Sequence, residues 1–169
     1  MEKTAPIKRV TSWIDPRHNP SAIVYGTIAI GLLIAAEDPS TETYPKLVEG
    51  TVVAIALLWF AHSYAHVVGQ RFKNRRPISV HEIIDVFTRE WALVWGATTP
   101  LLALVASWLV GAKLETAVTA ALWTAALTLF AFEVMAGIRA RLPGVALVGN
   151  AVIGAGLGAT LFAVKTLLN

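Results

Sequence analysis

The sequence contains no cysteine and few charged residues. Among its 169 residues there is not one cysteine, which excludes disulfide bonds and thiolate metal sites. Only 15% of the residues are charged and 56% are hydrophobic, whereas soluble domains average about 25% charged and about 45–50% apolar. This composition argues against a disordered chain, a water-soluble enzyme and a nucleic-acid-binding module. It is typical of an integral membrane protein.

Several motifs of known chemistry are also missing. The chain has no G-x-x-x-x-G-K-[ST] phosphate-binding loop, no G-x-S-x-G nucleophile elbow and no internal repeat. His62 and His66 have the spacing of one histidine box of the membrane di-iron desaturases, but those enzymes need several boxes and this chain has four histidines. After His81 and Glu82, Asp85 stands where a zincin helix needs its second histidine. We therefore assign no catalytic residue and do not expect an enzyme.

Long stretches without charge are the main feature that is present. A helix needs about 20 apolar residues to cross a hydrocarbon core of about 30 Å. The stretches are apolar nearly all round and do not alternate in polarity, so they indicate helices that face lipid rather than barrel strands. We predict an all-α integral membrane protein, a single-domain bundle of about five transmembrane helices over residues 20–169. The predicted spans are residues 20–36, 50–70, 90–111, 115–138 and 143–167.

The basic residues predict how these spans are oriented. Eleven of the 14 Lys and Arg residues fall in the N-terminal arm 1–19, the connection 71–89 and the turn 139–141, which alternate with segments that hold three. By the positive-inside rule, the N-terminus lies in the cytoplasm and the C-terminus outside, in the cytoplasmic (inner or plasma) membrane. The cytoplasmic arm is either a basic tail or a short interfacial helix.

The connection before the third span predicts an amphipathic helix. Ser79 and Glu82 fit a capping box, and the apolar side chains that follow share one broad face. We predict a single helix from about Ser79 to Val110 that lies first in the cytoplasmic interface and then spans the membrane. Pro100 removes one backbone hydrogen bond and is expected to bend this helix.

Ionisable groups inside the spans are the strongest functional signal, because each costs about 2.5–3.5 kcal/mol at mid-bilayer. With the predicted topology, the polar residues of three spans reach a similar depth in the cytoplasmic half of the membrane. The predicted intramembrane polar cluster consists of His62, His66, Glu133 and Asn150. The charges predicted just below it, at the cytoplasmic interface, are Arg89, Glu90 and Arg139.

Three interpretations of this cluster remain open. It forms a proton or cation path, a metal or haem site with His62, His66 and Glu133 as ligands, or a structural network of pairs and hydrogen bonds. The leading prediction is a small oligomeric proton or cation channel, or a transporter-like protein, without a cofactor. The alternative is a metal- or haem-binding membrane enzyme or electron-transfer subunit, or an accessory subunit of a larger membrane complex.

Small residues in the last span predict a close helix contact. Asn150, Gly154 and Gly158 are spaced four residues apart and share one helix face. Such a face serves either packing within the chain or an oligomer seam. The predicted partners are the lipid bilayer and either further copies of this chain or a membrane complex, with no nucleic acid.

Overall fold

The chain folds into helices throughout the part that the structure, a computed structural model, describes, which is residues 19–74 and 79–168. The interfacial helix considered for the N-terminal arm falls on residues 1–18 and lies outside these ranges. No strand occurs in the described residues. The helices are α2 (Pro20–Ala36), α3 (Tyr44–Asn74), α4 (Val80–Arg89), α5 (Trp91–Leu109), α6 (Leu114–Arg139) and α7 (Gly144–Leu168).

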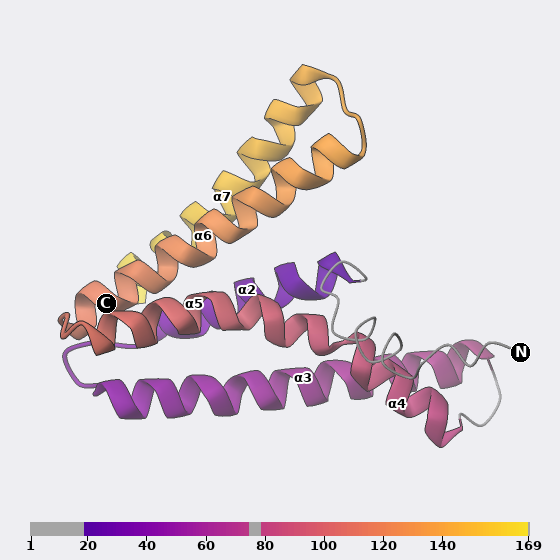
Figure 1. The fold of residues 1–169 in the computed structure, drawn as a ribbon, viewed down its shortest axis with the longest axis horizontal. Coiled ribbons are helices and arrows are strands. Elements are labelled where there is room, and N and C mark those ends of the chain that lie inside the picture. Colours follow the sequence, from indigo (N-terminus) through magenta and orange to yellow (C-terminus); the bar gives the residue numbers. More distant parts are fainter. Residues whose placement is uncertain (1–18, 75–78, 169) are drawn as a thin grey trace, which may run out of the picture.

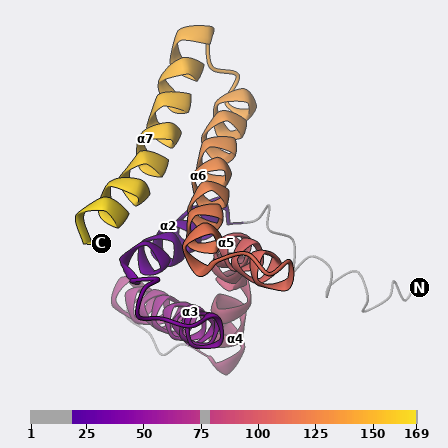
Figure 2. The same ribbon diagram turned by 90° about the vertical axis from the view of Figure 1, so that its left-hand side faces the viewer.

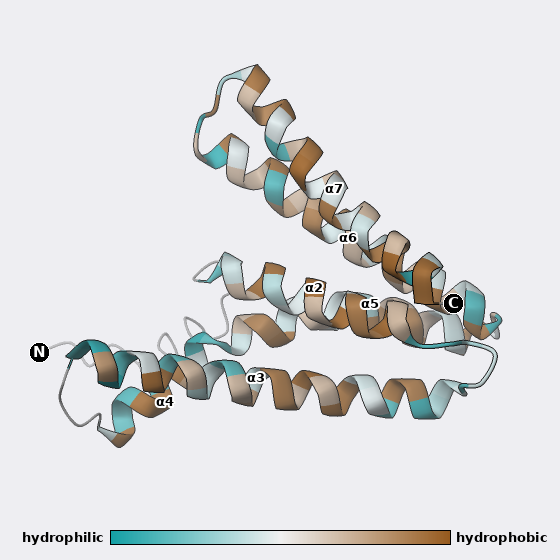
Figure 3. Cartoon of the chain, turned by 180° about the vertical axis from the view of Figure 1, so that it is seen from behind, coloured by the Kyte–Doolittle hydropathy of each residue, from teal (hydrophilic) through white to brown (hydrophobic). Residues whose placement is uncertain are grey.

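These helices confirm the predicted all-α membrane bundle. Helices α3, α6 and α7, and the continuous unit of α4 with α5, are each long and apolar enough to cross a membrane. Helix α2 is equally apolar but shorter, at 17 residues. Hydrophobic residues make up most of the length of the spanning helices, and hydrophilic residues gather toward helix ends and connections (Figure 3). The chain is therefore a multi-pass membrane protein.

The helices lie in three layers. Helices α2 and α5 pack against each other in the middle, α3 lies on one side of them, and the α6–α7 hairpin lies on the other (Figures 1 and 2). The hairpin packs on α2 and α5 near the C-terminus and diverges from them toward its own turn (Figure 1). We call the end of the bundle where α2 begins and α3 ends the Glu90 end. The large side chains buried between the layers are Ile30, Ile34, Leu104, Leu122, Leu129 and Leu161.

Helices α2 and α5 cross with their backbones in contact. A Cβ atom added at Gly96 would lie 2.0 Å from the carbonyl oxygen of Ile23, and one added at Gly26 would lie 2.2 Å from that of Leu93. No side chain fits in this space, so glycine is required at both positions. The crossing brings the start of α2 next to the start of α5, which positions the functional site described below.

The proline in α5 is accommodated at the same crossing. Pro100 has no N–H group, so the carbonyl of Gly96 lacks its partner within the helix. The hydroxyl groups of Thr27, from α2, and Thr99 each lie 3.0 Å from that carbonyl oxygen and donate to it. The helix remains continuous from Trp91 to Leu109 through the proline. The polar contact between α2 and α5 thus satisfies a carbonyl that proline leaves free inside the bilayer.

The prediction of one uninterrupted helix from about Ser79 to Val110 is wrong at one residue. Helix α4 ends at Arg89 and α5 begins at Trp91, with Glu90 between them. The carbonyl of Glu90 accepts a hydrogen bond from the amide of Leu93, a tight three-residue turn that changes the direction of the chain. Helix α4 accordingly turns away from the axis of α5 (Figure 1). The predicted capping box at the start of α4 is confirmed.

Two glycines of α7, Gly154 and Gly158, lie in a contact within the chain. A Cβ atom at Gly158 would lie 2.7 Å from Cβ of Ala126, and one at Gly154 would lie 2.9 Å from Cα of Phe130. Both neighbours belong to α6, so these two glycines allow the close approach of α6 and α7. An oligomer stays a prediction.

Candidate metal centre

A carboxylate is buried at the break between α4 and α5. Glu90 is only 4% exposed, although it lies at the end of an amphipathic helix. It falls on the same helix face as Val86, which is also buried, because the two residues are four positions apart. A buried carboxylate is costly unless other polar groups surround it. Helices α2 and α3 supply those groups.

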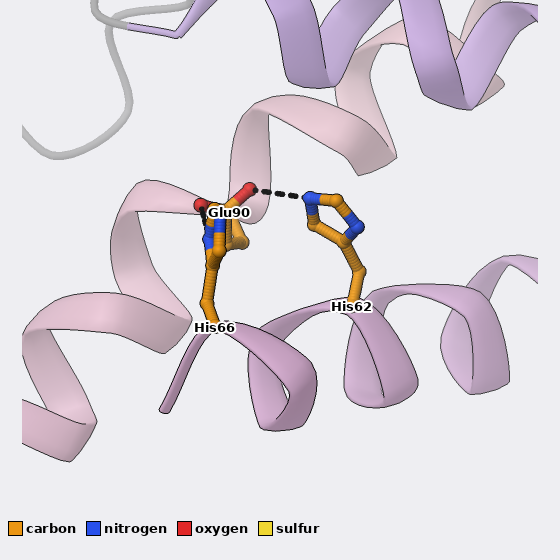
Figure 4. A group of neighbouring side chains, drawn as sticks. All are labelled: His62, His66 and Glu90. Atoms are coloured by element: carbon orange, nitrogen blue, oxygen red, sulfur yellow. Dashed lines mark hydrogen bonds and ion pairs between the residues drawn. The ribbon is translucent and has the colours of Figure 1, made fainter. Parts of the chain in front are cut away.

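Two histidines of α3 meet this carboxylate, one at each oxygen. Nδ1 of His66 lies 2.6 Å from Oε1 of Glu90, and Nε2 of His62 lies 3.3 Å from Oε2 (Figure 4). The two histidines are one helical turn apart, and their ring centroids are separated by 5.0 Å. The side chains of His62 and His66 are 29% and 55% exposed, so the site is open on the His66 side.

The residue that precedes α2 completes the surroundings of the carboxylate. Nδ2 of Asn19 donates to Oε2 of Glu90 at 3.2 Å. Oδ1 of the same side chain accepts from the backbone N–H of Ala22 at 3.2 Å and caps the start of α2. Glu90 therefore joins three parts of the chain: the start of α2, the C-terminal half of α3 and the α4–α5 junction.

Aromatic side chains hold the histidine-bearing turn of α3 in place. The ring of Tyr25, from α2, stacks on His62 with centroids 5.1 Å apart. Nε1 of Trp59 donates to the carbonyl oxygen of Phe87 at 3.1 Å, which fixes α4 against α3. The Trp59 ring also makes edge contacts with Phe87 and with Trp91. Tryptophan and tyrosine are enriched at membrane–water interfaces, so this belt is consistent with a site at interfacial depth.

The convergent atoms are of kinds that could bind a transition-metal ion. One ligand atom each from His62, His66 and Glu90 can be chosen so that all three lie within 4.8 Å of one another, and no other such group occurs in residues 19–74 and 79–168. Neutral imidazoles and a carboxylate are ligands of Zn²⁺ and of other divalent transition metals. Three protein ligands leave a fourth position open to water or substrate, as in catalytic zinc sites.

The structure distributes the predicted polar cluster over two places. His62 and His66 lie beside the buried carboxylate of Glu90. Glu133 and Asn150 lie together on the α6–α7 hairpin, where Nδ2 of Asn150 donates to the backbone carbonyl of Glu133 at 3.5 Å. Glu133 does not belong to the group of possible metal ligands, in which the carboxylate is that of Glu90.

The interface charges also occupy different environments. Arg89 and Arg139 lie exposed in the last turns of α4 and α6, respectively. Glu90, predicted beside them as an interface charge, is the buried centre of the site.

Two members of the site were not assigned to it from the sequence. For Glu90 a signal exists, because an acidic residue on the apolar face of an amphipathic helix indicates a buried partner. For Asn19 the sequence signals only the helix cap.

Comparison with known proteins gives no relative: the chain matches no protein-family model, no curated protein and no solved structure. A function therefore has to rest on the chemistry of this chain's own residues.

Proposed function

We propose that this protein is a multi-pass membrane protein that binds a divalent transition-metal ion between His62, His66 and Glu90. The observation that carries the proposal is the convergence of two imidazole nitrogens and a carboxylate oxygen within 4.8 Å. Zn²⁺ bonds of about 2.0–2.2 Å at tetrahedral angles place ligand atoms about 3.3–3.6 Å apart. The 3.3 Å spacing from Nε2 of His62 to the carboxylate has this length. The 2.6 Å contact of His66 is a hydrogen-bonding distance, and it would lengthen by about 0.7–1.0 Å to admit the ion.

The donor set selects the class of metal. Two nitrogens and one oxygen suit Zn²⁺, Fe²⁺, Co²⁺ or Ni²⁺, whereas Ca²⁺ and Mg²⁺ prefer oxygen ligands alone. The chain has no cysteine, so it offers no thiolate to favour Cu⁺ or a closed structural zinc site. The exposed side of His66 gives the ion a route to water, so the bound metal is exchangeable.

Charge and burial support the same conclusion. A buried carboxylate is stabilised by a cation, because an isolated buried charge is strongly unfavourable.

The proposal includes a location for the centre. The exposed basic residues Arg71, Lys73 and Arg89 lie at the Glu90 end of the bundle. By the positive-inside rule this end faces the cytoplasm, in the cytoplasmic membrane, with the N-terminus inside. The metal would then exchange with the cytoplasm. Conduction of protons or cations stays a prediction. Farther along the bundle, apolar side chains of the described residues fill the space between the layers and offer an ion no polar path there.

Metal titration of the purified protein tests the proposal. Zn²⁺ binding to the full chain in detergent is measured by calorimetry for the wild type, His62→Ala and His66→Ala. The matched control is His81→Ala, because His81 is an exposed residue of α4 that lies 3.9 Å from Asp85 in an ordinary surface pair. We expect one ion per chain in the wild type and the control, and its loss in both other variants. The proposal would be contradicted if the wild type binds no zinc. It would also be contradicted if His81→Ala loses as much zinc binding as His62→Ala and His66→Ala.

A further inference from the structure

We infer that Asn19 is a positioning residue that sets the metal affinity of the centre, an inference that rests on the proposed function. Asn19 contacts no proposed metal-binding atom of the histidines. It acts through Glu90, whose Oε2 accepts from Nδ2 of Asn19 at 3.2 Å. The same side chain caps α2 through its Oδ1. One residue thereby links the start of a spanning helix to the carboxylate of the metal centre.

The orientation of the Asn19 amide is fixed by its neighbours. Oδ1 accepts two hydrogen bonds, from the hydroxyl of Ser21 at 2.7 Å and from the N–H of Ala22 at 3.2 Å. Turning the amide over would set its NH₂ group against the N–H of Ala22 and its oxygen against the carboxylate of Glu90. Both contacts would be unfavourable, so the NH₂ group is directed at Glu90.

The requirement for a helix cap does not by itself explain an asparagine at this position. Serine and aspartate cap helices about as well as asparagine does, and threonine caps them somewhat less well. Aspartate at position 19 would turn a second carboxylate toward Glu90. Serine and threonine are shorter. Their one hydroxyl group acts as both acceptor and donor, so they have no separate donor group. Among the four common caps, only asparagine offers an acceptor to the helix and a separate amide donor to the carboxylate.

The contact controls how Glu90 presents its oxygens. Oε2 is held by Asn19 and also lies 3.3 Å from Nε2 of His62, which leaves Oε1 directed at Nδ1 of His66. Without the amide, the carboxylate can rotate toward the exposed side of His66 and lose its alignment with both imidazoles. Groups that hydrogen-bond to metal ligands in this way typically change metal affinity about 10–100-fold when they are replaced.

The test substitutes serine for Asn19, which keeps a helix cap and removes the amide. For Asn19→Ser we expect zinc affinity to fall about 10–100-fold. The thermal unfolding midpoint of the metal-free protein should fall by a few degrees at most, because the hydrogen bond to Glu90 is lost while serine keeps the helix cap. The visible spectrum of bound Co²⁺ should also change, because it reports coordination geometry. Asn150→Ser on α7 is the matched control, since its amide donates to a backbone carbonyl of α6 and not to the centre.

The outcomes separate this inference from the proposed function. If the wild type binds zinc and Asn19→Ser keeps its affinity and its Co²⁺ spectrum, the inference is overturned and the proposed function stands. A loss of affinity with an unchanged Co²⁺ spectrum would also overturn it, because a structural role of the cap would then suffice. If the wild type binds no zinc, both fail. Asn19→Thr, a second variant that keeps the cap, replaces Asn19→Ser if the latter does not fold.

Discussion

Replacing Glu90 by glutamine removes the charge of the centre while keeping the shape of the side chain. The carboxylate has one oxygen 2.6 Å from His66 and another that contacts His62 and Asn19 at 3.3 and 3.2 Å. Glutamine keeps one acceptor oxygen and replaces the other with an NH₂ donor. If that donor takes the place of Oε2, it faces the NH₂ group of Asn19. If it takes the place of Oε1, an NH₂ donor replaces the acceptor oxygen in the short contact with Nδ1 of His66.

The size of the effect follows from these contacts. A hydrogen bond to a charged group contributes about 1.5–3 kcal/mol, and exposure of the two imidazoles reduces their share. We therefore expect Glu90→Gln to lower the free energy of unfolding of the metal-free protein by about 2 kcal/mol. In the wild type, zinc at 100 times its Kd adds about 2.7 kcal/mol to the free energy of unfolding. If the variant binds 100-fold more weakly, the same zinc concentration adds only about 0.4 kcal/mol.

The assay is unfolding in detergent micelles, followed by circular dichroism, with and without zinc. Asp85→Asn provides a matched control, since it neutralises an exposed carboxylate of α4 that lies 3.9 Å from His81. The control should keep the full stabilisation by zinc. If Glu90→Gln is stabilised by zinc as strongly as the wild type, the reasoning about the centre is refuted, because the buried carboxylate would then not be a ligand.

Further predictions concern the helix crossing and the pH. Gly96→Ala should prevent folding or lower the unfolding temperature strongly, because its Cβ would lie 2.0 Å from the carbonyl oxygen of Ile23. Gly149→Ala, with open space around the added Cβ, should be neutral or slightly stabilising in the same unfolding assay. Thr27→Val should cost about 1 kcal/mol in denaturant unfolding, because the carbonyl of Gly96 loses one of its two donors. In calorimetry, zinc affinity of the wild type should fall as the pH is lowered, since a metal ion binds only the neutral imidazole.

The sequence predicts the helical bundle well because lipid imposes a simple constraint. Charge-free stretches mark the part of each helix that lies in the bilayer, and the first predicted span, 20–36, has the bounds of α2. The bounds of α3 differ, because a helix does not end where charged residues begin. Helix α3 runs from Tyr44 to Asn74, and Lys46 and Lys73 are accommodated in turns beyond the predicted span of 50–70.

The site could be predicted only in part, because depth in the membrane does not specify which helices are neighbours. His62 and Glu133 share a predicted depth, yet the helices that carry them, α3 and α6, lie on opposite sides of the α2–α5 layer. The neighbours are decided by the glycine crossing of α2 and α5, which brings Asn19 to Glu90. Neither the pairing of those glycines nor the turn at Glu90 follows from hydropathy. The acidic residue on the apolar face of α4 was the available signal.

X-ray absorption spectroscopy of the zinc-loaded protein tests the central claim most directly, because it reports the atoms bound to the metal. The proposed centre predicts a first shell of nitrogen and oxygen at about 2.0–2.2 Å, with the outer-shell scattering of two imidazoles. His62→Ala should reduce the imidazole count by one in any zinc that remains bound. A zinc ion surrounded by oxygen alone, or with an imidazole count that His62→Ala and His66→Ala leave unchanged, would contradict the assignment of His62, His66 and Glu90 as a metal centre.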